Sequence, residues 1–495
     1  MSGSTHPRTP CIVGVGSHTW HPDETGAAGA PEPIDMWEVV AAAADNDAGA
    51  SVLSHVDDLN IVYCHTWQYD DPAARLCERL HVAPRHREQS GIGGTTPQVL
   101  VQEAAARLWR GESEVALVVG GEALDTQRRY KRRAERYPYS FPPESKPSFP
   151  WEAPFHPAEV AHELFQAWLT FAIFDNARRA HLGVGLDEYR SQLGEQWHRF
   201  SQVAAANPEA WFPIERSAAE IITPTAENRL VGSPYTKFMI SMMDVDMAAA
   251  VLMTTEARAD ALGVPLDRRV YPRGWQYATD PVYVAEHPDL WRSPAMHTVT
   301  RDAFGAAGIG IDDVAHLDLY SCFASSINLM RDALGLTLDD SRPLTVTGGL
   351  PYHGGAASNY LTHAIAQMVR VLRDDPGEFG LVTGVGMHMT KHVAGVYSTT
   401  PGPLKVPEPA SAPTCVRIVD RFEGVATVSG YSVVHGRGGP EWALVVCDLP
   451  DAAGRAYARV EQADLLVDAS TTEWVGRAVT VVPQPDRPGV NMVSA

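Results

Sequence analysis

Positive charge is scarce in this sequence. Lysine and arginine together number 40 against 60 aspartates and glutamates, and the formal net charge at pH 7 is −20. Five of the 495 residues are lysine. Binding to a nucleic-acid backbone depends on clustered positive charge, so this balance argues against a nucleic-acid-binding protein. It leaves room for a small anionic ligand held by a local basic pocket.

Cysteine and long apolar runs are also sparse. The six cysteines form no C-x-x-C pair, which argues against zinc ribbons and thioredoxin-like motifs, so we expect no metal site. We expect free, mostly buried thiols in a reducing compartment. No run of roughly 18 apolar residues is long enough to span a bilayer. The N-terminus lacks a basic start followed by an apolar signal core, so we expect a cytoplasmic protein.

The chain contains two stretches in which strand patterns alternate with helix patterns. Such alternation predicts an α/β fold with parallel sheets covered by helices. A segment rich in proline, arginine and aromatics interrupts the first stretch, and an all-β tail follows a proline-rich linker. The predicted boundaries are 1–121 for the N-terminal half, 122–235 for an inserted loop domain, 236–262 for completion of the first half, 263–400 for the C-terminal half, 401–413 for the linker and 414–495 for a small β-barrel.

Local patterns predict individual elements within these units. In the insertion, two helices are expected over 158–183 and 186–207. "PLTVTGGLPYHGGAASNY" predicts a strand, a glycine-rich turn and then a helix, while 379–399 reads as a closing hairpin. The shared order of strand, functional turn and helix in the two α/β units indicates an internal duplication.

Four motifs appear in an order and spacing that resemble the thiolase superfamily. They are "GGEALDTQRRY", "MMDVDMAAAVLMT", "DLYSCFASSINLMRDALGL" and "VTGGLPYHGGAASNY". The resemblance covers about residues 11–400 and is strongest to sterol-carrier-type thiolases and actinobacterial thiolase-like proteins. It implies a duplicated five-layer αβαβα fold with an inserted helical loop domain. The tail resembles the small OB-like barrel of proteins that accompany thiolase-like enzymes.

The resemblance implies a nucleophilic cysteine that this chain does not have. Thiolases make or break a carbon–carbon bond next to a coenzyme A thioester, using a cysteine at a helix N-terminus and a second cysteine as acid and base. The first position falls at Gly94, within about one residue, where Thr95 and Thr96 would cap the following helix. The second falls at Thr383 or Gly384. Both positions are lost.

The resemblance also assigns candidate catalytic residues. His353 stands where the family has the histidine that binds the thioester oxygen, with packing of the turn as the alternative. Tyr320 replaces the asparagine that works with this histidine, and Tyr352 is its neighbour; each phenol could move a proton or could simply pack. Cys322 lies beside them, where packing is favoured over a nucleophilic role. His388 and His392, expected on one strand face, are weaker candidates.

Substrate-binding residues follow from the same resemblance. Lys237 and Ser241 lie where the family lines its pantetheine tunnel. Lys131, within "RRYKRR", could hold the coenzyme A phosphates or could belong to a surface loop. The aromatics Trp151, Phe155 and Trp168 indicate room for a bulky or apolar acyl group.

Three functions are therefore open. The first is acyl-CoA chemistry without a covalent intermediate, such as aldol or retro-aldol cleavage of a β-hydroxyacyl-CoA in lipid or sterol metabolism. The second is a non-catalytic acyl-CoA or lipid-binding module, and the third an acetyl-CoA acetyltransferase. We expect no cofactor beyond the coenzyme A thioester itself, and a monomer or a homodimer.

Overall fold

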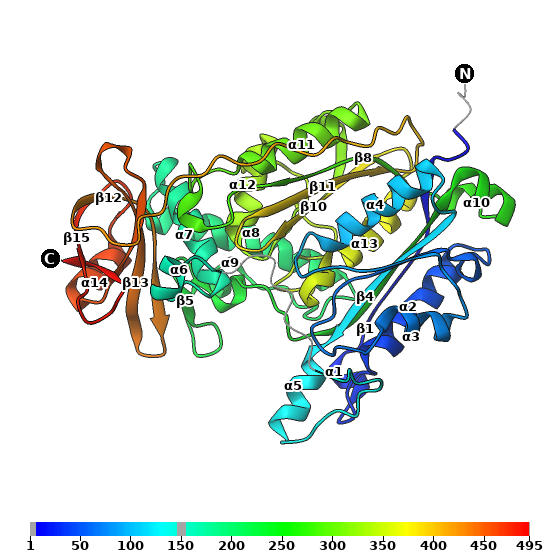
Figure 1. The fold of residues 1–495 in the computed structure, drawn as a ribbon, viewed down its shortest axis with the longest axis horizontal. Coiled ribbons are helices and arrows are strands. Elements are labelled where there is room, and N and C mark those ends of the chain that lie inside the picture. Colours follow the sequence, from blue (N-terminus) through cyan, green and yellow to red (C-terminus); the bar gives the residue numbers. More distant parts are fainter. Residues whose placement is uncertain (1–5, 146–154, 495) are drawn as a thin grey trace.

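The computed structural model describes residues 6–145 and 155–494. The molecule is elongated, with the C-terminal strands gathered at one end and the N-terminal sheet towards the other (Figure 1). Within the described residues the strands form three sheets. Two of them belong to the α/β halves, and the third contains the C-terminal barrel.

The first sheet has the order β1–β7–β4–β2–β3. Its strands span Pro10–Thr19, Asp246–Thr255, Val115–Ala123, Asp58–Ile61 and His86–Gln89 respectively. The sequence predicted parallel sheets, but β7 runs antiparallel to both of its neighbours, while β1, β4, β2 and β3 all run in the opposite direction to β7. The sheet is mixed because β7 follows the insertion and enters from the opposite end.

The second sheet repeats this arrangement. Its order is β8–β11–β10–β9, spanning Tyr271–Thr279, Lys391–Ser398, Phe379–Gly386 and Val314–Asp318. β11 is antiparallel to both β8 and β10, and β10 is parallel to β9. The strands β1, β7, β4 and β2 of the first sheet pair in the same way. The predicted hairpin over 379–399 is confirmed as β10 and β11.

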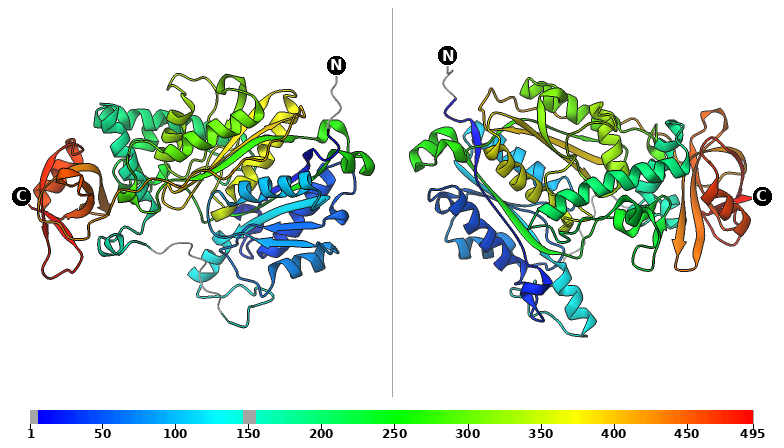
Figure 2. Two further views of the ribbon diagram at one scale, coloured as in Figure 1. Left: turned by 45° about the horizontal axis from the view of Figure 1, so that its top comes forward. Right: turned by 180° about the vertical axis from the view of Figure 1, so that it is seen from behind.

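Helices form three further layers around the two sheets (Figure 2). The outer layers contain α2 and α3 (Pro33–Asp47, Pro72–Leu80) and α11 and α12 (Pro294–Ala307, Ala324–Leu334), while α4 and α13 (Thr96–Arg110, Tyr360–Asp374) lie between the sheets. Gly14 on β1 and Gly274 on β8 allow matching close approaches, since a Cβ on either would strike a carbonyl of the covering helix. The five-layer αβαβα fold is therefore confirmed.

The fifth strand of the second sheet is missing from the described structure. The sequence predicted a strand within 343–347, in the place that β3 takes in the first half, but no ladder forms there. The buried carboxylate of Asp318 instead accepts hydrogen bonds from the Thr345 hydroxyl (2.9 Å) and from the amides of Val346 (3.0 Å) and Thr347 (3.3 Å). These bonds occupy amides that a strand would need.

The insertion is helical, but its first helix is broken. The helices are α5 (Leu124–Arg132), α6 (Pro157–Ala161), α7 (Ala167–His181), α8 (Leu186–Ala206) and α9 (Ala218–Ile222). The single helix predicted over 158–183 is wrong, because Glu163 has a φ of 61° between α6 and α7. Barrel residues hold this break: Arg459 pairs with Glu163 at 2.8 Å, and the Asn491 amide donates to His162 Nε2 at 3.0 Å.

The C-terminal strands close into a five-stranded barrel within the described residues. They are β12 (Gly424–Gly436), β13 (Gly439–Asp448), β14 (Arg455–Val460), β15 (Ala478–Pro483) and β16 (Asn491–Ser494), and β12 pairs with both β13 and β15. The sequence missed β16 and the helix α14 (Ala463–Thr471). Two strands of the insertion, β5 (Leu230–Gly232) and β6 (Tyr235–Thr236), extend the barrel sheet through β12.

The remaining helices are the short α1 (Pro22–Thr25) and α10 (Glu256–Leu262). In the described parts of the chain, no helix combines the length and apolar character needed to cross a bilayer.

Candidate active site

A cavity of about 560 Å³ lies where both α/β halves meet the insertion. We call it the inner cavity. Five segments border it: the N-terminus of α4, the loop after β2, the turn between β9 and α12, the loop before α13 and the turn after β10. Its walls include His65, Gly93, Gly94, Phe155, Glu159, Trp168, Phe171, Ser241, Tyr320, Cys322, Leu350, Ser358, Val385 and His388. Trp151 lies outside the described residues.

Gly94, the first lost cysteine position, lines this cavity just before α4. A Cβ built on Gly94 would clash with the Tyr320 hydroxyl oxygen and with the Val385 carbonyl, at separations under 3.0 Å. The phenol of Tyr320 thus occupies the space into which a side chain at position 94 would extend. The predicted hydroxyl caps are wrong: Thr95 makes no side-chain capping bond, and Thr96 Oγ1 donates to the Gly93 carbonyl at 2.9 Å.

The second lost cysteine position is closed as well. Thr383 is buried in β10, where its Oγ1 accepts a 3.0 Å hydrogen bond from the Tyr320 amide. A Cβ on Gly384 would lie 2.5 Å from Leu361 Cδ1 and 2.7 Å from Val393 Cγ1. Neither residue lines the inner cavity. Neighbouring atoms therefore fill the space beside Gly94 and Gly384, and Thr383 is buried away from the cavity.

Tyr320 and Cys322 present protonated groups to the cavity. Burial, and secondarily the nearby Cys322, raises the pKa of Tyr320 well above its usual value. Burial also raises the pKa of Cys322 to about 12, and its Sγ donates to Ser326 Oγ at 3.6 Å. At neutral pH the phenol is a hydrogen-bond donor and the thiol is a poor nucleophile.

His353 and Tyr352 do not line the cavity that they were expected to share with Tyr320. His353 is buried, its ring centroid lies 5.4 Å from that of His363, and burial lowers its pKa. The Tyr352 hydroxyl is enclosed without a partner in the described structure, and its ring packs on Trp197. The loop does reach the cavity, but through Leu350, Ala357 and Ser358.

Two polar residues of the cavity wall, His65 and Ser358, were not predicted from the sequence. Ser358 Oγ lies 3.4 Å from His65 Nε2 and accepts a 3.2 Å hydrogen bond from the Gly93 amide. The His65 amide donates to the buried Glu122 at 2.7 Å, and burial lowers the pKa of the His65 imidazole to about 4. A histidine just beyond the carboxyl end of a parallel strand is the signal that could have identified it.

His388 and His392 are on different elements, contrary to the expectation that they share a strand face. His388 lies in the turn after β10, lines the cavity and has Nδ1 3.0 Å from Thr170 Oγ1. Burial lowers its pKa to about 4. His392 lies on β11, buried away from the cavity, with Nε2 3.1 Å from Asp280. In the described residues no group of three His, Cys, Asp or Glu could hold a metal ion.

A second, larger hollow adjoins the inner cavity. This outer groove has a volume of about 1160 Å³ and lies between the insertion and the hairpin of β12 and β13. Trp168, Ile240 and Ser241 line both spaces, so the two are neighbours. Lys237 lies in the outer groove, as do the residues Glu227, Arg229, His435 and Arg437.

Lys131 lies elsewhere. It is exposed on α5, the first helix of the insertion, and lines neither the outer groove nor the inner cavity. Neighbouring arginines of the same run are neutralised locally, since Arg128 and Arg129 both pair with Asp125.

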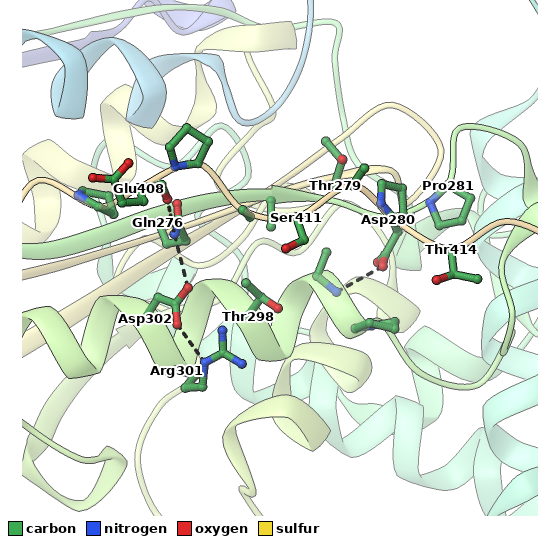
Figure 3. A pocket seen from close by; sticks show the side chains of 18 of the residues that line it. Gln276, Thr279, Asp280, Pro281, Thr298, Arg301, Asp302, Glu408, Ser411 and Thr414 are labelled. Atoms are coloured by element: carbon green, nitrogen blue, oxygen red, sulfur yellow. Dashed lines mark hydrogen bonds and ion pairs between the residues drawn. The ribbon is translucent and has the colours of Figure 1, made fainter.

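A further groove, of about 1100 Å³, runs beneath the proline-rich linker, between β8 and α11 (Figure 3). Several of its polar groups are already engaged. Asp302 accepts hydrogen bonds from Arg301 at 2.7 Å and Gln276 at 3.2 Å, and Asp280 accepts from the Ala295 amide at 3.1 Å. We therefore take the inner cavity, where donors and acceptors still face open space, as the candidate active site.

Comparisons with known proteins agree with this fold. No protein-family model matches the chain. The monomeric SCP2-thiolase-like protein type 1 from Mycobacterium smegmatis superposes with a TM-score of 0.84 at 31% identity, over 99% of this chain and 100% of that one. The Ltp2-ChsH2(DUF35) aldolase gives a TM-score of 0.61 at 16% identity, over 79% of this chain and 98% of that one, which is a likeness of fold.

The curated relatives match a shorter region. The 3-ketoacyl-CoA thiolase of Escherichia coli O9:H4 (strain HS) is 34% identical over 155 residues, 28% of this chain and 33% of that enzyme. The match thus spans about a third of that relative's length. Since the Mycobacterium smegmatis protein is matched over its full length, the chain belongs to the SCP2-thiolase-like proteins of the thiolase superfamily.

Proposed function

We propose that this protein binds a coenzyme A thioester and breaks or forms a carbon–carbon bond without an acyl-enzyme. One observation carries the proposal: the Tyr320 phenol fills the space beside Gly94 where a thiolase nucleophile would lie. A covalent acyl-enzyme has no residue to form on there. The chemistry must then proceed by proton transfer and hydrogen bonding to the bound thioester.

The outer groove and inner cavity together suit the two ends of such a ligand. Arg229, Lys237 and Arg437 give the outer groove more positive than negative charge, since Glu227 is the one acidic residue among its described lining. The phosphates of coenzyme A would bind there, and the pantetheine arm would pass Ser241 to reach Tyr320. We propose binding roles for Lys237 and Ser241, as expected from the sequence, and none for Lys131, which lines neither space.

The acyl group would occupy an aromatic and apolar space. Phe155, Phe165, Trp168, Phe171 and Phe323 all line the inner cavity. Burial of apolar surface stabilises binding by about 25 cal/mol per Å², so a bulky hydrocarbon group is favoured over acetyl. We infer a substrate from lipid or sterol metabolism.

Retro-aldol cleavage of a β-hydroxyacyl-CoA is the reaction that fits these groups. A base removes the β-hydroxyl proton, the bond between the α- and β-carbons breaks, and its electron pair enters the thioester as an enolate. The enolate then takes a proton at the α-carbon. The products are an aldehyde or ketone and a shortened acyl-CoA.

Two residues that face the cavity have opposite roles: one accepts a proton and the other donates a hydrogen bond. His65 is neutral because burial lowers its pKa, and we assign it to the hydroxyl proton. Tyr320 stays protonated and donates to the thioester oxygen as negative charge develops. The N-terminus of α4 adds a favourable electrostatic potential beside Gly94. His353 and Tyr352 have no part in this scheme, since their side chains are enclosed elsewhere.

The test is turnover of a panel of β-hydroxyacyl-CoAs, followed by mass spectrometry of both products. Y320F should lower kcat about 100-fold, the effect typical of losing one donor to a developing oxyanion. Y352F is the matched control, because it removes a phenol hydroxyl outside the cavity and should leave kcat near wild type. Equal rates in Y320F and wild type would contradict the assignment.

Two other functions give different outcomes in the same assays. Coenzyme A binding with no turnover of any member of the panel would identify a non-catalytic acyl-CoA-binding module. Thiolysis of acetoacetyl-CoA at rates of a working thiolase would identify an acetyl-CoA acetyltransferase. We expect no such thiolysis, because both cysteine positions are filled.

A further inference from the structure

A small pocket on the side of the insertion contains a buried, unpartnered arginine. This side pocket, of about 330 Å³, lies between α8, α12 and the loop 337–345. Figure 1 shows α8 and α12 as neighbours in the middle of the molecule. Arg331 projects from α12 into the pocket and is 5% exposed. Its side chain makes no hydrogen bond or ion pair to any described residue, and its Nε is fully enclosed.

Two neighbouring carboxylates, Asp332 and Asp340, are engaged by other arginines. Asp332 receives two hydrogen bonds from Arg178, at 2.6 Å and 2.8 Å. Asp340 is held by Arg342 through hydrogen bonds of 3.0 Å and 2.7 Å. The positive charge of Arg331 is therefore left without a close counter-charge.

The other charged groups around the pocket lie at its rim. Glu188, Glu195 and Arg199 are exposed on the outer face of α8. Gln196, which also lines the pocket and is 9% exposed, has an amide nitrogen without an acceptor in the described structure. Two donors are thus enclosed at the same pocket with nothing to receive them.

An uncompensated buried charge is costly, so its persistence needs an explanation. Burial, followed by the charge of Arg178, lowers the pKa of Arg331, which is the expected response to an absent counter-ion. A guanidinium binds a carboxylate through two parallel N–H···O bonds. An anion bound in the pocket would accept hydrogen bonds from Arg331. Its negative charge would also offset the repulsion between Arg331 and Arg178.

The rest of the lining mixes apolar side chains with the polar Ser191, Gln192, Thr337 and Thr345. Phe200, Val203 and Leu344 border the pocket, and Pro343 and Leu338 lie on its loop side. The volume corresponds to about eleven water-sized units of about 30 Å³ each. That size suits a short chain rather than a nucleotide or a complete acyl-CoA.

We propose that the side pocket binds a small carboxylic acid with an apolar chain, its carboxylate on Arg331 and its chain against Phe200 and Val203. The site is separate from the inner cavity and does not depend on the function proposed above. A single buried cation matches a monoanion, and the apolar side chains of Phe200, Val203 and Leu344 favour a hydrocarbon chain over a phosphate ester.

Octanoate is a suitable probe, and the whole chain is titrated with it by calorimetry. We expect saturable binding, with octanol weaker by at least about tenfold because it lacks the charge. R331L should weaken octanoate at least about tenfold, the ratio that corresponds to about 1.4 kcal/mol. Because Arg331 has no partner to lose, R331L should also melt no lower than wild type when octanoate is absent.

V203F supplies a second arm, since it fills the pocket without changing any charge and should also weaken octanoate at least about tenfold. It carries the test if R331L does not fold. A167W, which fills the inner cavity instead, is the matched control and should leave the affinity unchanged. The proposal would be overturned if octanoate showed no saturable binding. It would also be overturned if A167W lost binding while R331L and V203F kept the wild-type affinity.

Discussion

Gly94 and Tyr320 form a pair in which each residue requires the other. The glycine leaves a space at the start of α4, and the phenol fills it. By the resemblance to thiolases, a cysteine would stand at position 94 and an asparagine at position 320. Both exchanges are needed together, because a cysteine and a tyrosine would compete for one volume.

Restoring the cysteine alone should therefore destabilise the protein. G94C forces a side chain against the Tyr320 hydroxyl and the Val385 carbonyl, and such overpacking typically costs about 1–3 kcal/mol. The free energy of unfolding is measured by urea denaturation. G94C/Y320N should recover part of the loss, because the shorter amide vacates the space. A double variant as unstable as the sum of two independent single variants would contradict this coupling.

Buried histidines should make stability depend on pH in a defined direction. Burial lowers the pKa of His388 to about 4, whereas an unfolded histidine has a pKa of about 6.5. Between these values the unfolded chain binds a proton at this site and the folded chain does not. The free energy of unfolding therefore falls as the pH falls, by up to about 1.4 kcal/mol per pH unit from this one residue.

H388Q removes this contribution. Its unfolding free energy should decline less steeply than that of wild type between about pH 6.5 and pH 4. Urea denaturation of both proteins at several pH values measures the difference. Parallel curves would mean that the folded His388 takes up a proton as readily as the unfolded one.

The site could be predicted from the sequence only in part. Tyr320 lies in the turn between β9 and α12, and both elements are recognisable in the sequence. Its position at the cavity could therefore be anticipated. His353 lies in a glycine-rich turn, where side-chain direction has no periodicity, and the turn presents Ser358 instead. His65 meets Ser358 only because loops far apart in sequence converge, and no local pattern records that contact.

At the level of elements, hydrogen bonds to the Asp318 side chain hold the segment 343–347 where a strand was predicted. Its carboxylate accepts from Thr345, Val346 and Thr347, and from the Tyr360 hydroxyl at 2.9 Å. D318A would leave several buried donors unsatisfied, each costing about 1–3 kcal/mol. We expect a loss of about 3 kcal/mol or more in the free energy of unfolding, measured by denaturation. D339A, which truncates an exposed acid nearby, should stay within about 0.5 kcal/mol of wild type.

The same segment explains where element prediction fails. Strong periodicity gave the helices α2, α4, α8 and α13 and most strands, because burial of one face dictates such patterns. The segment 343–347 alternates like a strand, yet one distant carboxylate redirects its amides. The break between α6 and α7 likewise depends on Arg459 and Asn491 of the barrel. Tertiary partners far along the chain override local preference in both cases.

At the scale of the whole molecule, the barrel is joined to the insertion and to the C-terminal half through buried or partly buried polar contacts. The Tyr457 hydroxyl donates to Glu159 at 2.9 Å and accepts from the Ala285 amide at 2.9 Å. Arg455 donates to the Pro288 carbonyl at 3.0 Å. Glu159 lines the inner cavity, so the barrel supports one wall of the candidate site.

Removing that hydroxyl should weaken the junction. Y457F leaves the Ala285 amide without its acceptor and takes one donor from the Glu159 carboxylate, and we expect a loss of about 1–3 kcal/mol in the free energy of unfolding. Y130F removes a hydroxyl from an exposed contact and is the matched control, expected within about 0.5 kcal/mol of wild type. Equal losses in the two variants would argue that the junction carries no special energy.

The strands β5 and β6 have a consequence for the order in which the chain folds on the ribosome. They lie in the insertion, but the sheet they join is completed by β12, which is synthesised much later. Until then the nascent insertion exposes unpaired strand edges, and such edges favour association with other chains. Synthesis of this protein therefore includes an interval in which a chaperone has a defined surface to protect.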